Sequence, residues 1–197
     1  LHWMMDNVPN ARARAEAGHL TATVEYRHGP GQWRQAFEDV ETAIESIQLS
    51  GREWTIHNDA PRRITLVGHS SGGQLALWAA ARAGTLVTGV VALAPAAALA
   101  TMSQEGLGGG VVEEFLGGTP SETPEAYAAA DPLGLAPQIP VRILHGAADG
   151  VIPLAISERY AAAHPGVRLE VVDGADHATW GDPTSAAWSH LLTAVRE

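Results

Sequence analysis

Two patterns of apolar and polar positions alternate along the chain. Short runs of consecutive apolar residues are separated by longer segments in which apolar residues recur every three or four positions. The first pattern is typical of buried strands and the second of amphipathic helices. The predicted strands are residues 21–26, 64–67, 87–93, 141–144 and 168–172. The predicted helices are residues 1–17, 33–49, 75–83, 154–163 and 184–196. This alternation predicts an α/β fold, a mostly parallel sheet flanked by helices, in a single domain over residues 1–197.

The alternation is interrupted between residues 96 and 137. Glycine and proline are frequent in this segment, and only a short stretch around residues 111–116 is typical of a helix. Long irregular insertions in compact domains are usually functional, so we expect a lid-like or substrate-binding segment here. A solvated surface excursion without a function is the alternative.

The charge and the cysteine content narrow the classes of partner and site. The chain has 22 acidic and 12 basic side chains and a formal net charge of −10, which repels phosphate backbones and anionic lipids. We therefore expect no nucleic-acid partner and no membrane partner. The absence of cysteine excludes disulfides, thiolate metal sites and a cysteine nucleophile, and it fits a cytoplasmic location, although exported proteins can also lack cysteine.

A nucleophile motif lies between a predicted strand and a predicted helix. Residues 68–72 read Gly-His-Ser-Ser-Gly and match G-x-S-x-G, and this context raises the central serine above the sheet edge. We predict Ser70 as the nucleophile and the backbone N–H of Ser71 as one oxyanion donor. Gly68 and Gly72 are expected to make room for the turn, because a Cβ at either position would meet a neighbouring element. A glycine-rich turn capped by serine is the structural alternative, and Ser71 is the competing nucleophile.

The general base is sought among the histidines that follow Ser70. These are His145, His164, His177 and His190. His177 comes just after the predicted strand 168–172, and the carboxyl ends of parallel strands are where catalytic groups collect. His164 and His190 fall in or at the end of predicted helices. We therefore predict His177 as the base.

The acid that orients the base should lie between the serine and the histidine in this fold class. Asp149 follows the predicted strand 141–144, one strand before that of His177, and is the predicted acid. The rivals are Asp131, Asp173 and Asp176. Asp131 lies in the insertion, and the other two are too close in sequence to His177 to orient it easily.

These three residues predict acyl transfer through a covalent intermediate on Ser70, with a small-molecule acyl substrate. The nine histidines show no His-x-x-x-His or His-Glu-x-x-His spacing, so we expect neither a metal nor another cofactor. A serine peptidase is the alternative reaction. A non-catalytic binding protein built on the same fold is the alternative class.

Further segments, taken with the motif, carry a resemblance to a known family. They are residues 25–27, the helix with Trp33, Phe37, Asp39 and Val40, and residues 68–73, 115–118, 130–132, 145–149 with Pro153, and 182–183 with Trp188. Together they resemble the α/β-hydrolases related to kynurenine formamidase and to the small esterases called BD-FAE-like. The resemblance covers nearly the whole chain. It implies an α/β-hydrolase fold, the triad Ser70, Asp149 and His177, and a carboxylesterase or arylformamidase activity.

The chain departs from this family at its start. The family carries a His-Gly-Gly stretch at the end of an early strand, and the backbone of that stretch supplies the second oxyanion donor. No His-Gly-Gly occurs in this sequence, which begins at Leu1. We therefore expect the first strands of the fold to be missing, with residues 21–26 beside an exposed edge that favours association with a second copy. A minimal hydrolase with another second donor is the alternative.

Overall fold

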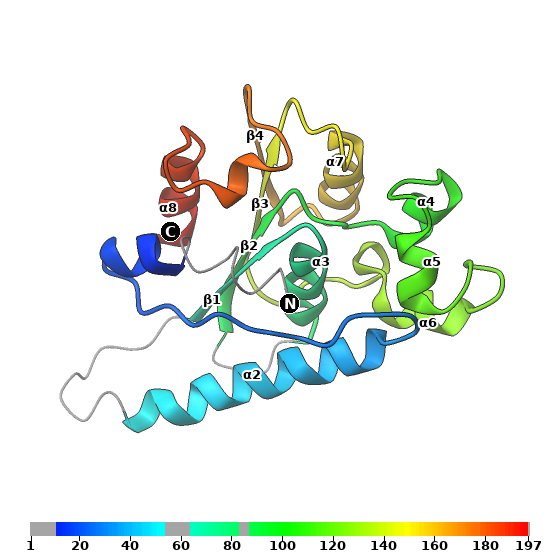
Figure 1. The fold of residues 1–197 in the computed structure, drawn as a ribbon, viewed down its shortest axis with the longest axis horizontal. Helices are drawn as coiled ribbons and strands as arrows, with labels where there is room; N and C mark the ends of the chain where they lie inside the picture. Colours follow the sequence, from blue (N-terminus) through cyan, green and yellow to red (C-terminus); the bar gives the residue numbers. More distant parts are fainter. Residues whose placement is uncertain (1–10, 54–63, 83–86, 197) are drawn as a thin grey trace.

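A parallel sheet forms the centre of the molecule. The computed structural model describes residues 11–53, 64–82 and 87–196 (Figure 1), so the first ten residues of the predicted helix 1–17 lie outside the described ranges. Within these ranges the sheet has four strands in the order β1-β2-β3-β4, and every neighbouring pair is parallel. The strands are β1 (Ile64–His69), β2 (Val87–Leu93), β3 (Val141–Gly146) and β4 (Arg168–Val172). The predicted α/β fold class is confirmed.

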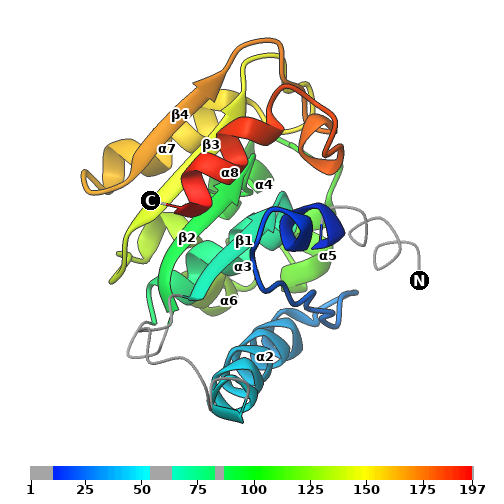
Figure 2. The same cartoon turned by 90° about the vertical axis from the view of Figure 1, so that its left-hand side faces the viewer.

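Helices cover both faces of the sheet. Helices α3 (Ser71–Ala80) and α7 (Leu154–Ala163) pack on one face, and α8 (Trp188–Arg196) packs on the other (Figures 1 and 2). Alternate residues of β2 divide between the two cores, since Val90 joins the α3 side and Val91 joins the α8 side. This division follows from the two-residue period of a strand.

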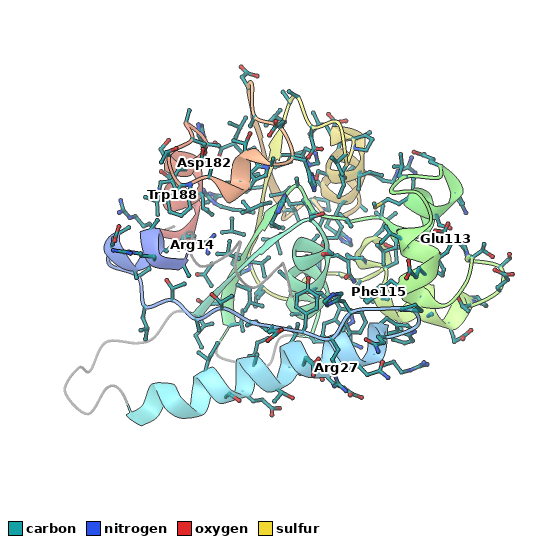
Figure 3. The ribbon with its side chains drawn as sticks, viewed as in Figure 1. Arg14, Arg27, Glu113, Phe115, Asp182 and Trp188 are labelled. Atoms are coloured by element: carbon teal, nitrogen blue, oxygen red, sulfur yellow. The ribbon has the colours of Figure 1, made fainter. Side chains whose placement is uncertain are left out.

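The long helix α2 (Trp33–Glu53) lies outside α3 rather than directly on the sheet (Figure 2). The Phe37 ring stacks on Trp78 of α3 with a centroid separation of 3.9 Å. On the opposite side of the sheet, residues 11–16 form a short helix beside α8 (Figure 3). There the Arg14 guanidinium lies 5.7 Å from the centre of the Trp188 ring. No helix in the described ranges combines the length and the apolar character that a membrane crossing requires.

Residues 96–137 are more regular than the sequence predicted. They form α4 (Leu99–Gln104), α5 (Val111–Leu116), α6 (Pro124–Ala130) and the 3-10 turn η1 (Pro132–Gly134), grouped beside α3 (Figure 1). The buried Asp131 carboxylate accepts hydrogen bonds from the backbone N–H groups of Leu99 at 3.0 Å and Ala100 at 2.9 Å. Because the first N–H groups of a helix have no partner within it, this carboxylate completes the start of α4. A function of this segment as a lid stays a prediction.

Among the predicted elements that differ in the structure are one strand and the last helix. Residues 21–26 form no strand, because their backbone pairs with no neighbour in the described ladder. The chain is held there by side chains instead, with the Arg27 backbone N–H and guanidinium both donating to Asp39 of α2 at 2.8 Å. The last helix begins at Trp188 rather than at residue 184, because the Asp182 carboxylate accepts from the Thr184 backbone N–H at 2.8 Å and closes a turn.

Candidate active site

The nucleophile motif forms a sharp turn between β1 and α3. Ser70 has φ 56° and ψ −117°, a conformation that is rare for a residue with a side chain. Three backbone hydrogen bonds hold it. The Ser70 N–H donates to the Leu93 carbonyl of β2 at 2.9 Å, and the Ser70 carbonyl accepts from Gln74 at 3.1 Å and from Ala96 at 3.2 Å. The strained residue is therefore fixed by the next strand as well as by its own helix.

Two glycines make this turn possible, but only one of them is the glycine that we predicted. A Cβ on Gly68 would lie 2.1 Å from the Gly72 carbonyl oxygen, a distance that real side chains do not reach. The second tight position is Gly73, where a Cβ would lie 2.8 Å from the Pro95 side chain. At Gly72 the nearest contact of a Cβ would be the Tyr26 hydroxyl at 3.9 Å, which is ordinary contact. The expectation that Gly72 is sterically required is wrong, because α3 turns its next residue toward Pro95.

Three predicted side chains meet at the carboxyl ends of the strands. His177, in the loop after β4, lies with Nε2 3.1 Å from the Ser70 hydroxyl and Nδ1 2.8 Å from Asp149 Oδ2. Asp149, in the loop after β3, has a fully buried side chain, while that of His177 is 16% exposed. Because a carboxylate only accepts, His177 donates from Nδ1 and its Nε2 is free to accept the Ser70 proton. Ser70, His177 and Asp149 thus form one hydrogen-bonded chain.

The Asp149 carboxylate is ionised by its surroundings. Burial alone would raise its pKa, but donors to both oxygens outweigh that effect and lower it. The second oxygen, Oδ1, accepts from the backbone N–H groups of Val151 at 2.8 Å and Ile152 at 2.9 Å. Asp149 therefore carries the negative charge that stabilises a protonated His177.

The predicted oxyanion donor lies beside Ser70. Ser71 is the first residue of α3, so its backbone N–H belongs to the helical turn whose N–H groups lack a partner within the helix. Its side chain is exposed and lies 3.3 Å from the Tyr26 hydroxyl, not on His177. The structure thus directs the Ser71 side chain away from the base.

The alternatives weighed from the sequence lie elsewhere. Asp131 completes α4, and the exposed Asp176 binds Thr179 in its own turn. Of the remaining histidines, His190 is paired with Glu170, and His164 packs on the ring of Tyr160. In the described part of the chain, no group of three or more histidine, aspartate or glutamate side chains is arranged to hold a metal ion.

Two histidines of the site were not predicted from the sequence. The ring of His69 lies with its centre 4.6 Å from that of His177. Burial, together with the proximity of His177, lowers the pKa of His69 to about 4, so that this ring is neutral near pH 7. The other is His145, which is completely buried next to Asp149. The signal available for both was position, since His69 lies within the nucleophile motif and His145 lies at the end of β3, just before the loop that carries Asp149.

Solved structures with the same fold include two esterases and a peptidase. The truncated form of a carbohydrate esterase from gut microbiota is 21% identical, with a TM-score of 0.68 over 83% of this chain and 69% of that chain. An acetyl ester-xyloside bifunctional hydrolase from Caldicellulosiruptor lactoaceticus is 18% identical, with a TM-score of 0.65 over 82% of this chain and 64% of that one. A puromycin-hydrolysing peptidase from Mycobacterium tuberculosis is 24% identical, with a TM-score of 0.59 over 74% of this chain. The present chain spans only 22% of the length of that peptidase.

At these identities the likeness is one of fold alone. No curated protein matches the sequence significantly. The relation to kynurenine formamidase stays a prediction. The family model BD-FAE, in contrast, matches residues 3–163, which is more than half of the chain and includes the nucleophile and acid segments. The chain therefore belongs to the BD-FAE family of α/β-hydrolases.

Proposed function

We propose that this chain is a serine hydrolase that cleaves a small carboxylic ester or an aryl formamide through an acyl-enzyme on Ser70. The observation that carries the proposal is the hydrogen-bonded chain from the Ser70 hydroxyl through His177 to Asp149. Hydrolase activity in general is further supported by the names of the structural neighbours, which are those of esterases and peptidases.

The geometry fits the following sequence of steps. The Ser70 oxygen attacks the substrate carbonyl while His177 Nε2 takes the hydroxyl proton. The Ser71 backbone N–H donates to the oxyanion of the tetrahedral intermediate, and Asp149 stabilises the imidazolium across the 2.8 Å contact with Nδ1. His177 then gives its proton to the leaving alcohol or amine. Water, activated by the same nitrogen, attacks the acyl-enzyme and releases the acid together with free Ser70.

The same triad would also serve the hydrolysis of a peptide bond. The peptidases of similar fold are several times longer, and this chain spans 22% and 27% of two of them. Peptide hydrolysis is the second candidate, and it is favoured by the fact that these structural neighbours are peptidases. Comparing turnover of p-nitrophenyl acetate, N-formylaniline and an aminoacyl p-nitroanilide separates the three reactions.

Covalent labelling tests the proposal directly. A fluorophosphonate probe should label the wild-type chain once, and peptide mapping should place the label on Ser70. Ser70→Ala should lose both labelling and ester hydrolysis. Ser71→Ala is the matched control, because it keeps the backbone N–H and should keep both. Labelling that survives in Ser70→Ala would refute the proposal.

A further inference from the structure

One buried histidine is bound on both sides of its ring although the proposed reaction does not use it. His145 lies at the end of β3 with no exposed surface. Its Nδ1 lies 2.7 Å from the Ser157 hydroxyl of α7, and its Nε2 lies 2.9 Å from the Ile152 carbonyl oxygen. The same Nε2 lies 3.5 Å from Asp149 Oδ2. This histidine is therefore the link between the end of β3, α7 and the acid loop, residues 149–152.

The partners of the His145 ring fix its tautomer. A carbonyl oxygen and a carboxylate oxygen both face Nε2, and both can only accept a hydrogen bond. Nε2 must therefore carry the proton, and Nδ1 accepts from the Ser157 hydroxyl. Burial lowers the pKa of His145, which disfavours a second proton on the ring. The ring is thus a neutral donor toward the acid loop, with the proton on Nε2.

Ile152 is hydrogen-bonded both to His145 and to the Asp149 carboxylate. The Ile152 carbonyl accepts from His145, while the Ile152 backbone N–H donates to Asp149 Oδ1 at 2.9 Å. The other carboxylate oxygen accepts from His177 at 2.8 Å. One residue of the loop is therefore tied by its carbonyl to β3 and by its N–H to the carboxylate. A rotation that frees Ile152 from His145 would also turn Asp149 away from His177.

We propose that His145 is a positioning residue that holds residues 149–152 in the conformation in which Asp149 orients His177. This inference rests on the proposed function, because it gives His145 a role in assembling the triad. Ser157 completes the arrangement by donating its hydroxyl proton to Nδ1, the ring nitrogen that carries no proton. Partners that orient a metal-binding histidine by a hydrogen bond change activity by about 10- to 100-fold when they are replaced, and we expect an effect of the same order here.

Two replacements of His145 separate positioning from mere packing. The amide of His145→Gln reaches the region of Nε2 and can still donate to the Ile152 carbonyl. The shorter side chain of His145→Asn reaches only the region of Nδ1 and leaves that carbonyl without its donor. We expect His145→Asn to lower kcat by about 10- to 100-fold with little change in KM, and His145→Gln to keep most of the activity. His164→Gln is the control, because this histidine ends α7 and its ring packs on Tyr160 rather than on residues 149–152.

The pH dependence of activity distinguishes positioning from a general loss of stability, because a less stable variant keeps the pH profile of the wild type. The groups that face His177 are Asp149, Ser70 and the ring of His69. The groups that face His145 are Asp149, Ser157 and the Ile152 carbonyl, and Glu158 lies farther away. A carboxylate that turns away stabilises the imidazolium form of His177 less. The acidic limb of kcat/KM should move to lower pH in His145→Asn and stay in place in His145→Gln.

Nitrogen-edited NMR of the histidine rings tests the same arrangement without a substrate. In the wild type, His145 should show the proton on Nε2 throughout the range from pH 5 to 8, and His145→Asn should change the Nδ1–H resonance of His177. A proton on Nδ1 of His145, or an Asn variant with an unchanged His177 resonance and acidic limb, would overturn the inference. A wild-type chain that hydrolyses none of the substrates would instead refute the proposed function. The NMR result would still decide the role of His145.

Discussion

Replacing Asp149 with asparagine should disable the base while leaving the fold in place. The two oxygens of this carboxylate have different partners, since Oδ1 accepts from two backbone N–H groups and Oδ2 accepts from His177. An asparagine amide has one oxygen and one NH2 group. If its oxygen stays on the backbone donors, the NH2 group faces His177 Nδ1. The ring must then move its proton to Nε2, where it can no longer accept from Ser70.

The opposite orientation of that amide is unfavourable. It would set the NH2 group against the N–H groups of Val151 and Ile152, so both backbone donors would lose the acceptor that they have in the wild type. The wrong tautomer of His177 is therefore the stable outcome. The same change in a serine protease triad lowers kcat by about 10⁴-fold, and we expect a loss of that order here.

The assay is turnover of p-nitrophenyl acetate from pH 5 to 9, together with the rate of fluorophosphonate labelling. The melting temperature should be measured in parallel to show that the variant is folded. Asp176→Asn is the matched control, because that carboxylate is exposed and binds Thr179 rather than His177. A folded Asp149→Asn chain that keeps more than a tenth of the activity at neutral pH would refute the reasoning.

Two further predictions concern the turn and its neighbouring histidine. Gly68→Ala should prevent folding, because the added Cβ would lie 2.1 Å from the Gly72 carbonyl oxygen. The control Gly134→Ala adds a Cβ with nothing within 4 Å, so its melting temperature, followed by circular dichroism, should be close to that of the wild type. The pKa of His69 is lowered from 6.5 to about 4 in the folded chain. Between these two pH values the unfolded chain therefore binds more protons at this site than the folded chain does. The stability that this site contributes to the folded chain is consequently lost as the pH falls from 6.5 to about 4. Urea unfolding at pH 7 and pH 4.5 should therefore show a smaller loss of stability in His69→Gln than in the wild type, and an equal loss would contradict the shift.

The strands and the order of the site residues could be predicted because local signals specify them. The predicted bounds of β2 and β4 agree with the structure, since each is a short run rich in apolar residues that ends at a turn former. The nucleophile motif and the loops after β3 and β4 also placed Ser70, Asp149 and His177 in one region, because parallel strands end at the same edge of a sheet. For these features the neighbouring residues in the sequence carry enough information.

The features that were missed depend on contacts between distant residues. Residues 21–26 have the composition of a strand, but a strand also needs a partner, and composition does not say whether one is present. Helices α4 and α6 have only 6 and 7 residues, too few to show a helical period. Their ends are completed by Asp131 and by the Trp78 indole, which donates to the Ala129 carbonyl at 3.1 Å. The environments of His69 and His145 likewise exist only after the strands have assembled.

The backbone of Ser70 also links reactivity to the folding pathway. Its strained conformation is held by hydrogen bonds to Leu93 and Ala96, so it becomes stable only after β1 has paired with β2. Its contact with His177 spans 107 positions of sequence, and such distant contacts form late because a long loop must first be closed. Partly folded forms of the chain therefore present an ordinary, unreactive serine. On the proposed function, a covalent probe of Ser70 would count only molecules that have completed folding, and labelling would then measure the native population during refolding.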